Sequence, residues 1–463
     1  MKFKDIHIVY LIGIGGIGMS ALARYFHLTG KKVVGYDKVG TSLTKSLQEE
    51  GISVHYQDRI EEMPGFLVEE SSKNKTLVIY TPAIPQNHAI LNHLKKQGFT
   101  ALKRARVLGM LSEDKTCIAV GGTHGKTSIS TMCAHIMQQS SNGCNAFLGG
   151  IAKNFNTNLF FNAQSRYIVT EADEYDRSFL QLSPSYAVIT SMDADHLDIY
   201  GNISEIHSSF NRFSGSIEKK GALVVHQNIR DQLNTESTKY TYALDDPRAD
   251  FYAQNIRIKN TGFVFDLITP FTCIEQIQFP LPGMVNIENA IAAASIPVIL
   301  GINNQIIKKA LETFKGVKRR FDIQVNTEDS FYMDDYAHHP REIEVCIRAV
   351  RDLFPGKKIT GIFQPHLFSR TNDLAGEFAQ SLDQLDEAII MNIYPAREKP
   401  IKGVTSKIIY DKMVRAGKHI YSKEEVLEYI KQYTPGVLIT MGAGDIDQLV
   451  RPIKQLLMHQ EQH

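Results

Sequence analysis

The sequence lacks any apolar run of about 18 residues, the length that a helix needs to cross a bilayer core. We therefore expect no membrane span. It also lacks a net charge of either sign, because 51 lysines and arginines face 50 aspartates and glutamates, which leaves a formal charge of +1. Proteins that bind nucleic acid or an anionic membrane surface usually carry a clear basic excess. We expect neither kind of partner.

Closely spaced cysteines are also missing. The five cysteines are an odd number, are scattered and form no CxxC pair: Cys117, Cys133, Cys144, Cys273 and Cys346. Disulfide frameworks and structural zinc sites need paired or clustered cysteines, so this pattern indicates reduced thiols. The N-terminus has two lysines before an apolar stretch, like a signal peptide, but no small-residue cleavage site follows. We expect a cytoplasmic protein.

What the sequence does have is a repeated alternation of apolar strands and helical patterns. A chain of 463 residues is too long for one core, and the alternation predicts three α/β domains with parallel sheets. We place these domains at residues 1–104, 105–319 and 320–463. The expected strands are 6–12, 32–36, 76–80, 116–120, 167–170, 187–190, 331–333, 358–363, 387–391 and 437–440. The expected helices are 19–29, 42–50, 127–138, 283–300, 341–353 and 374–382.

The first glycine turn, Gly13–Gly18, follows a strand and opens a helix. This arrangement is typical of the Rossmann fingerprint, in which glycines let the backbone approach a pyrophosphate and the helix N-terminus supplies N–H groups. Asp37 stands at the end of the next strand, where a carboxylate can accept hydrogen bonds from ribose hydroxyls. Alone, the turn indicates a nucleotide or sugar-nucleotide diphosphate and does not indicate hydride transfer.

The second glycine turn, Gly121–Thr127, also lies between a strand and a helix. It ends in Gly-Lys-Thr, as phosphate loops do: backbone amides hold phosphate oxygens, Lys126 neutralises charge and the Thr127 hydroxyl can bind Mg²⁺. The strict Walker spacing needs glycine at position 120, where Val120 stands, so only a shorter form of the motif is present. Two phosphate sites in separate domains suggest that a nucleotide-linked substrate meets ATP.

Eight motifs together make the sequence similar to the Mur ligase family of bacterial peptidoglycan synthesis. They follow the family's order and span about residues 6–445: GIGGIGMS (13–20), GGTHGKTS (121–128), EADEYD (171–176), DADHLDIYG (193–201), NIENAIAA (286–293), RRFD (319–322), DDYAHHP (334–340) and FQPH…SRT (363–371). The resemblance implies a Rossmann-like nucleotide-sugar domain, a central P-loop ATPase-like mononucleotide-binding domain and a C-terminal Rossmann-like domain.

The resemblance also implies a reaction. ATP would phosphorylate the lactyl carboxylate of UDP-N-acetylmuramate, and the amine of L-alanine would then displace phosphate from the acyl phosphate. Phosphoryl transfer depends mainly on positioning and charge neutralisation, so ATP and Mg²⁺ are the expected cofactors. We expect a monomer or a homodimer.

The motifs assign roles residue by residue, as what the resemblance implies. The expected catalytic residues are Lys126, His196, Arg320, Asp335 and His338. The expected ATP-binding residues are Gly122, Thr123, His124, Gly125, Lys126, Thr127, Ser128, Asn289 and Arg320. The expected UDP-sugar-binding residues are Gly15, Gly16, Ile17, Gly18, Ser20, Asp37 and Thr81. The expected amino-acid-binding residues are Tyr336, His366 and Arg370, and the expected metal ligands are Thr127, Glu171 and His196. The segment 394–398 would complete the amino-acid pocket, and Asn286 would lie near the adenine.

Two positions and one segment distinguish this chain within the family. Val285 stands where relatives often have histidine, and Leu367 stands where some have a second arginine, so Arg370 alone would bind the alanine carboxylate. Many Mur ligases carry a carbamylated lysine some fifteen residues after the metal-binding histidine, but residues 197–217 contain no lysine. The alanine-adding branch lacks this lysine as well, so its absence favours that branch.

Three alternatives stay open. A recycling ligase that attaches a ready-made tripeptide to the same nucleotide would need a larger third-domain pocket. An NAD-dependent dehydrogenase would explain the first turn but not the second. An ATP-binding regulator without catalysis would use only the phosphate loop.

Overall fold

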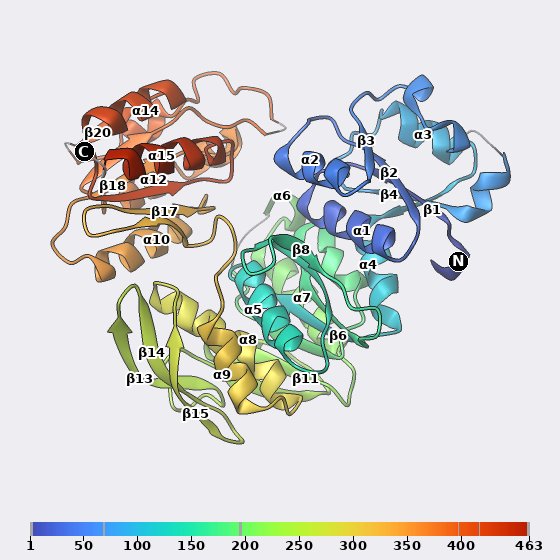
Figure 1. The fold of residues 1–463 in the computed structure, drawn as a ribbon, viewed down its shortest axis with the longest axis horizontal. Coiled ribbons are helices and arrows are strands. Elements are labelled where there is room, and N and C mark those ends of the chain that lie inside the picture. Colours follow the sequence, from blue (N-terminus) through green and yellow to red (C-terminus); the bar gives the residue numbers. More distant parts are fainter. Residues whose placement is uncertain (1–2, 68–69, 194–196, 397, 416, 461–463) are drawn as a thin grey trace. The chain divides into compact units, whose positions relative to one another are not determined.

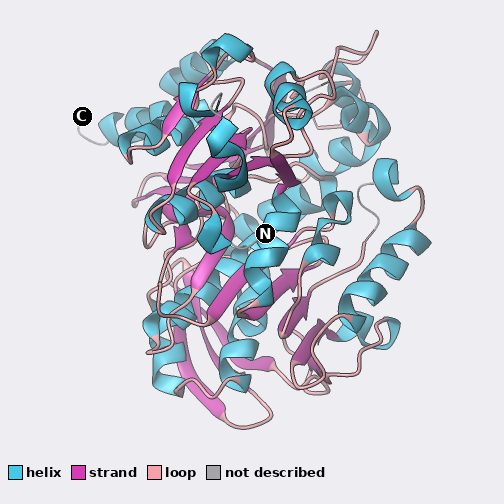
Figure 2. Cartoon of the chain, turned by 90° about the vertical axis from the view of Figure 1, so that its right-hand side faces the viewer, coloured by secondary structure: helices cyan, strands magenta, loops and turns pink. Residues whose placement is uncertain are grey.

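The computed structural model describes residues 3–67, 70–193, 197–396, 398–415 and 417–460 (Figure 1). They form two compact units: the first comprises residues 1–257, 264–279 and 288–315, and the second comprises residues 258–263, 280–287 and 316–463. Helices lie against strands throughout (Figure 2). No helix within the described ranges is long and apolar enough to cross a membrane.

The N-terminal sheet has five parallel strands in the order β3-β2-β1-β4-β5. Its strands are β1 Ile8–Ile12, β2 Lys32–Tyr36, β3 Ser53–His55, β4 Thr76–Tyr80 and β5 Thr100–Lys103. Its helices are α1 Ile17–Leu28, α2 Ser42–Glu49, α3 Ala89–Lys96 and α4 Arg104–Glu113, with short 3₁₀ helices at Phe3–Asp5, Ile60–Glu62, Gly65–Leu67 and Glu70–Lys75. This is the predicted Rossmann-like arrangement, with β1 at the centre of the sheet and the glycine turn at its carboxyl end.

The central sheet has seven strands in the order β12-β11-β10-β6-β9-β7-β8, all parallel except the antiparallel pair β7 and β8. Its strands are β6 Thr116–Gly121, β7 Asn145–Ala152, β8 Thr157–Phe160, β9 Tyr167–Ala172, β10 Tyr186–Ile189, β11 Ala222–His226 and β12 Thr238–Tyr242. Its helices are α5 Lys126–Gln139, α6 Leu197–Tyr200 and α7 Ile203–Gly215, with 3₁₀ helices at Tyr175–Gln181 and Gln227–Gln232. The phosphate loop leaves the buried strand β6 at the middle of this sheet.

A small three-stranded sheet, in the order β13-β14-β15, is not foreseen by the sequence analysis. Its strands are β13 Tyr252–Lys259, β14 Gly262–Ile268 and β15 Cys273–Phe279, and helices α8 Met284–Ile299 and α9 Asn304–Glu312 follow. β13 is largely solvent-exposed, so it lacks the apolar run that reveals a buried strand.

The C-terminal sheet has six strands in the order β16-β17-β21-β18-β19-β20, and only the pair β16 and β17 is antiparallel. Its strands are β16 Asp322–Asn326, β17 Phe331–Asp335, β18 Ile359–Phe363, β19 Glu387–Ile390, β20 Lys418–Ile420 and β21 Val437–Met441. Its helices are α10 Pro340–Leu353, α11 Phe368–Asp373, α12 Ala375–Leu382, α13 Lys407–Tyr410, α14 Lys423–Gln432 and α15 Asp447–Gln460. The predicted three-domain α/β fold is confirmed, whereas the boundaries after residues 104 and 319 stay predictions.

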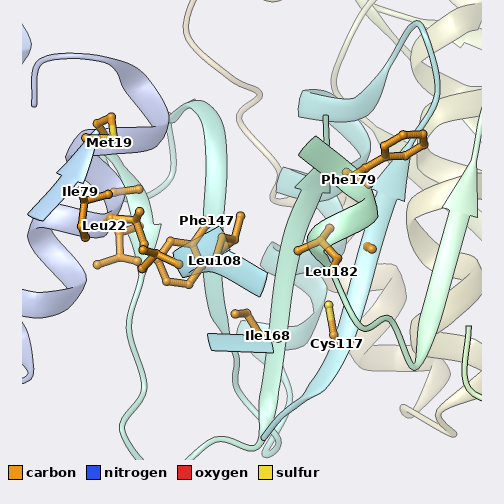
Figure 3. Packing of buried hydrophobic residues seen from close by; sticks show 14 of the residues in the cluster. Met19, Leu22, Ile79, Leu108, Cys117, Phe147, Ile168, Phe179 and Leu182 are labelled. Atoms are coloured by element: carbon orange, nitrogen blue, oxygen red, sulfur yellow. The ribbon is translucent and has the colours of Figure 1, made fainter. Parts of the chain in front are cut away.

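Within the first unit, one hydrophobic cluster joins the N-terminal and central sheets. Leu22 of α1 packs beside Phe147 of β7, and both are almost fully buried (Figure 3). Burying a side chain of this kind contributes about 1.5–3 kcal/mol. A polar contact lies beside the cluster, because Arg24 of α1 donates a hydrogen bond to Asn158 of β8. The first glycine turn and the phosphate loop therefore belong to the same compact unit.

Candidate active site

The first glycine turn is shaped by Asp37, which follows β2. Its Oδ2 accepts a hydrogen bond of 2.8 Å from the Gly15 N–H, and its Oδ1 accepts one of 3.2 Å from the Val39 N–H. Thr81 stands next to the turn, because a Cβ built on Gly13 would lie 2.6 Å from the Thr81 methyl carbon. Contact between Asp37 and a ribose stays a prediction; in the structure the carboxylate orders the turn.

The start of α1 carries the remaining predicted residues of this site. Ser20 is fully buried, and its hydroxyl donates to the Ile17 carbonyl at 2.9 Å and accepts from the Asn158 amide at 2.9 Å. The N–H groups of Ile17 and Gly18 have no acceptor within the described residues. These two donors stand at the positive end of a twelve-residue helix, where a phosphate is favoured.

The phosphate loop is tied to the chain that follows β10. Thr190 donates from its hydroxyl to the His124 carbonyl at 2.6 Å, and the Asp193 N–H donates to the Thr123 hydroxyl at 2.9 Å. Gly122 has a φ of +122°, and a Cβ at this position would lie 2.0 Å from the Thr190 hydroxyl. Only glycine fits there, since both the backbone conformation and the space exclude a side chain.

Helix α5 begins at Lys126, directly after Gly125. The N–H groups of Lys126 and Thr127 find no acceptor in the part of the chain that the structure describes. Asn289 of α8 lies against the loop, because a Cβ on Gly125 would come within 2.9 Å of its side-chain oxygen. The loop thus combines open backbone donors, a lysine and a neighbouring amide, the donor types that hold a nucleotide.

Lys126 is paired with Glu174, a residue whose role the sequence analysis does not assign. The Lys126 ammonium lies 2.9 Å from the Glu174 carboxylate and donates at 2.6 Å to the Gly122 carbonyl. Burial alone would lower the pKa of Lys126, but the charges of Glu174 and Asp173 outweigh it and raise the pKa. The lysine is therefore fully charged at neutral pH.

Glu171 lies on strand β9, one residue before its end, rather than after the strand as expected. Its Oε1 accepts 2.7 Å from the Gly149 N–H, and Ser130 and Thr127 also donate to its carboxylate. Burial raises the pKa of Glu171, while Lys126 acts in the opposite direction. Glu171, Thr127 and Lys126 are thus close to one another, and their contact with a phosphate or a metal ion stays a prediction.

Two further expectations concern Asn286 near the adenine and the set of metal ligands. Asn286 is buried, and its amide donates at 2.7 Å to the Pro282 carbonyl at the start of α8. His196 and Arg397 lie outside the described residues, so the predicted metal set of Thr127, Glu171 and His196 stays a prediction. Among the described side chains, no group of three His, Cys, Asp or Glu is arranged to hold a metal ion.

In the second unit, the neighbouring Arg319 and Arg320 differ in their partners. Arg319 donates to Asp334 at 3.2 Å and also to the Gly444 carbonyl at 3.3 Å. The Arg320 guanidinium stacks 4.9 Å from the Tyr336 ring centre and has no hydrogen-bond acceptor within the described residues. Arg319 therefore serves the fold, and Arg320 keeps its donors available for a ligand.

Asp335 ends β17 and fixes the backbone next to Arg320. Its carboxylate accepts from the Phe321 N–H at 2.7 Å and from the Ala337 N–H at 2.8 Å. Burial raises the pKa of Asp335 to about 6, although Arg320 opposes this shift. His338 follows in the same loop, and its Nδ1 lies 3.1 Å from the Tyr336 carbonyl and 3.2 Å from Glu342. Because both neighbours are acceptors, Nδ1 carries the proton and Nε2 is the basic atom.

Two of the predicted amino-acid-binding residues, His366 and Arg370, follow β18, whereas the third, Tyr336, follows β17. The rings of His338 and His366 lie 6.1 Å apart, and His366 stacks on Tyr394 at 5.7 Å. Burial lowers the pKa of His338, and the charge of Arg370 adds to this effect. The Arg370 guanidinium has no hydrogen-bond partner within the described residues. A cavity of about 270 Å³ opens beside Tyr394 at the same edge of the sheet.

Comparison with known proteins identifies the family. Three domain descriptions match in order: "Mur ligase family, catalytic domain" at residues 8–116, "Mur ligase middle domain" at 120–296 and "Mur ligase, glutamate ligase domain" at 319–444. A UDP-N-acetylmuramate–L-alanine ligase of Parabacteroides distasonis is 46% identical over 99% of both chains. One of Cytophaga hutchinsonii is 45% identical over 98% of both.

The chain belongs to the Mur ligase family.

Solved structures agree with this Mur ligase assignment. The UDP-N-acetylmuramate–alanine ligase of Thermotoga maritima matches with a TM-score of 0.79 and 25% identity, covering 98% of this chain and 99% of that one. The murein peptide ligase of Psychrobacter arcticus matches with a TM-score of 0.69 at 18% identity, which shows the shared fold alone. As a Mur ligase, the chain uses ATP, and the loop at Gly122–Thr127 is where its phosphates are expected.

Proposed function

We propose that this Mur ligase joins L-alanine to the lactyl carboxylate of UDP-N-acetylmuramate, converting ATP to ADP and phosphate. The product is UDP-N-acetylmuramoyl-L-alanine, a peptidoglycan precursor. The observation that carries the proposal is full-length similarity, at 43–46% identity, to proteins named UDP-N-acetylmuramate–L-alanine ligase. The absence of lysine from residues 197–217 supports the same branch of the family.

The first step uses the phosphate loop. A carboxylate oxygen of UDP-N-acetylmuramate attacks the γ-phosphorus of ATP, and the bond from that phosphorus to the bridging oxygen breaks, so that ADP leaves. The open N–H groups of Lys126 and Thr127 hold the phosphate oxygens, and the Lys126 ammonium leaves Glu174 to neutralise the charge that develops. Arg320 supplies a second cation from the link before the third domain.

Mg²⁺ is the metal that fits the residues present. The Thr127 hydroxyl donates to the Glu171 carboxylate, and hard oxygen donors of this kind are the ligands that Mg²⁺ prefers. Thr127 and Glu171 would hold the ion, together with His196 outside the described residues. When bound, it would supply positive charge to the phosphate oxygens. The chain itself holds the Thr127 hydroxyl and the Glu171 carboxylate close to Lys126.

The second step needs a neutral amine. L-alanine carries an ammonium group at neutral pH, and His338 accepts one of its protons at Nε2, since burial keeps this imidazole neutral. The amine nitrogen then attacks the acyl carbon, the carbon–oxygen bond to phosphate breaks, and the departing phosphate takes the second proton that the nitrogen loses as the amide forms. Arg370 binds the alanine carboxylate, and Asp335 orients Arg320 through the Phe321 N–H. Asp335 therefore acts as a positioning residue, and His338 accepts the proton.

We place the protein in the cytoplasm, where both nucleotides are available, because all five cysteines are free and four of them are buried. The proposal is tested by phosphate release from ATP in the presence of UDP-N-acetylmuramate and one amine at a time. Phosphate release should be fastest with L-alanine and slower with glycine or L-serine. Release that requires the tripeptide L-alanyl-γ-D-glutamyl-meso-diaminopimelate, and not L-alanine, would indicate the recycling ligase instead.

A further inference from the structure

We propose that Arg104 is a further substrate-binding residue, whose guanidinium binds the diphosphate of the UDP-linked substrate at the first glycine turn. No sequence motif points to this residue. The inference rests on the proposed function for the identity of the substrate, but its geometry belongs to the first unit alone.

The guanidinium of Arg104 lies directly on the first turn of α1. Arg104 is the first residue of α4, immediately after β5 at the carboxyl edge of the N-terminal sheet. A Cβ built on Gly18 would lie 2.6 Å from its Nη1 atom and 3.2 Å from its Cζ atom. Gly18 therefore leaves space that Arg104 fills, and the arginine head stands where the turn offers its N–H donors.

The donors of Arg104 are mostly unused. A guanidinium has five N–H donors, and among the described residues this one reaches only the Asp173 carboxylate, at a long 3.4 Å. Its side chain is 24% exposed, so a ligand can reach it. Beside it, the Ile17 and Gly18 N–H groups also have no acceptor within the described ranges. Together they form a donor set that matches the oxygens of a diphosphate.

Neighbouring cations do not share this placement. Lys103 forms a 2.7 Å ion pair with Asp176, so its charge is already neutralised. Arg106, two residues further along α4, is exposed and pairs with Glu113 of the same helix. Arg104 is thus distinguished by its contact with Gly18, and Arg106 offers a matched control on the same helix.

Asp173 explains how Arg104 is held ready. It precedes Glu174, the partner of Lys126, so one acidic segment places a carboxylate at each phosphate-binding turn. The long Arg104–Asp173 contact orients the guanidinium while leaving its remaining donors for a stronger acceptor. A diphosphate, with more charge than one carboxylate, supplies that acceptor.

The test is binding of UDP, which has the diphosphate but neither the sugar nor the lactyl carboxylate, measured by isothermal titration calorimetry. Arg104→Ala should weaken UDP binding about 10- to 100-fold, as expected for the loss of a charge-assisted contact. Arg104→Lys should recover part of the affinity, since it keeps the charge without the planar fork. Arg106→Ala should bind UDP like the wild type.

Binding of a non-hydrolysable ATP analogue, measured on the same samples, should be unchanged in every variant. Unchanged UDP affinity in Arg104→Ala would overturn the inference, and so would an equal loss of ATP-analogue binding, because that would show a general structural defect. Ligase activity of the wild type separates the two proposals. If L-alanine is not ligated, the proposed function fails, whereas the Arg104 inference is decided by UDP binding alone.

Discussion

The Lys126 ammonium lies 2.9 Å from the Glu174 carboxylate, and the two side chains are only 16% and 4% exposed. Without a nucleotide, Glu174 therefore compensates the charge that the loop brings to its phosphates. A buried cation without its partner destabilises a fold, and breaking such a pair is more costly than its net stabilising effect. Glu174 therefore neutralises Lys126 while the phosphate loop is empty, and removing its charge should destabilise the nucleotide-free protein.

Glu174→Gln should lower the stability of the nucleotide-free protein by about 1–3 kcal/mol, because glutamine keeps a hydrogen bond but not the charge. An ATP analogue supplies the missing negative charge, so it should raise the melting temperature more in this variant than in the wild type. Differential scanning fluorimetry measures both effects. Glu113→Gln, at an exposed pair on α4, is the control. If the ATP analogue raised the melting temperature equally in Glu174→Gln and the wild type, Glu174 would not be the group that neutralises Lys126 in the nucleotide-free protein.

Gly122→Ala should lower kcat/KM for ATP about 100-fold or more, since a displaced loop misplaces the phosphates. The added Cβ would lie 2.0 Å from the Thr190 hydroxyl, at a φ of +122° that side chains rarely adopt. Gly376→Ala is the matched control, because nothing lies within 4 Å of that position in helix α12. It should leave steady-state kinetics unchanged. Near-normal kinetics of Gly122→Ala would show that the loop can move without cost.

Arg370→Ala should raise KM for L-alanine about 10- to 100-fold, because the guanidinium would no longer pair with the amino-acid carboxylate. KM for ATP and for UDP-N-acetylmuramate should stay within about twofold. Arg348→Ala, at an exposed ion pair with Glu344 on α10, controls for loss of a surface arginine. A rise in KM for ATP instead would show that Arg370 acts on the ATP phosphates and not on the alanine carboxylate.

His135 of α5 should make the first unit sensitive to acid. Burial lowers its pKa to about 4 from 6.5, so the folded state favours the neutral ring. A depressed histidine pKa stabilises the fold above pH 6.5 and loses this contribution as the pH falls toward 4. Between about pH 7 and pH 5 the loss should be about 1–2 kcal/mol.

His135→Asn removes this titration and should flatten the pH dependence of unfolding. Urea unfolding of wild type and variant at several pH values, followed by circular dichroism, measures the difference. The same slope in both proteins over this range would show that another group is responsible.

The buried parts of the fold are readable from the sequence. Strands β2 and β4 have the predicted bounds, because a strand covered on both faces is a continuous apolar run. The sheet β13-β14-β15 has no such run in its exposed β13, and β7 contains the adjacent Gly149 and Gly150, which weaken a strand pattern. Strands such as these depend on tertiary neighbours that a local pattern does not contain.

In the site, too, the sequence predicts some residues but not how they pair. Lys126 and Thr127 follow from the loop motif, since the chemistry needs those residue types at that spacing. The pairing of Lys126 with Glu174 does not, because four acidic residues lie in 171–176 and the sequence does not say which one faces the lysine. Arg319 and Arg320 are likewise equivalent in sequence, and only their acceptors distinguish them.

The central claim is that ATP activates the lactyl carboxylate of UDP-N-acetylmuramate for attack by L-alanine. The direct measurement uses UDP-N-acetylmuramate labelled with ¹⁸O in that carboxylate, followed by mass spectrometry of the phosphate released with L-alanine. The account predicts that one labelled oxygen appears in each phosphate, because the carbon–oxygen bond of the acyl phosphate breaks. Amide formed together with unlabelled phosphate would contradict it.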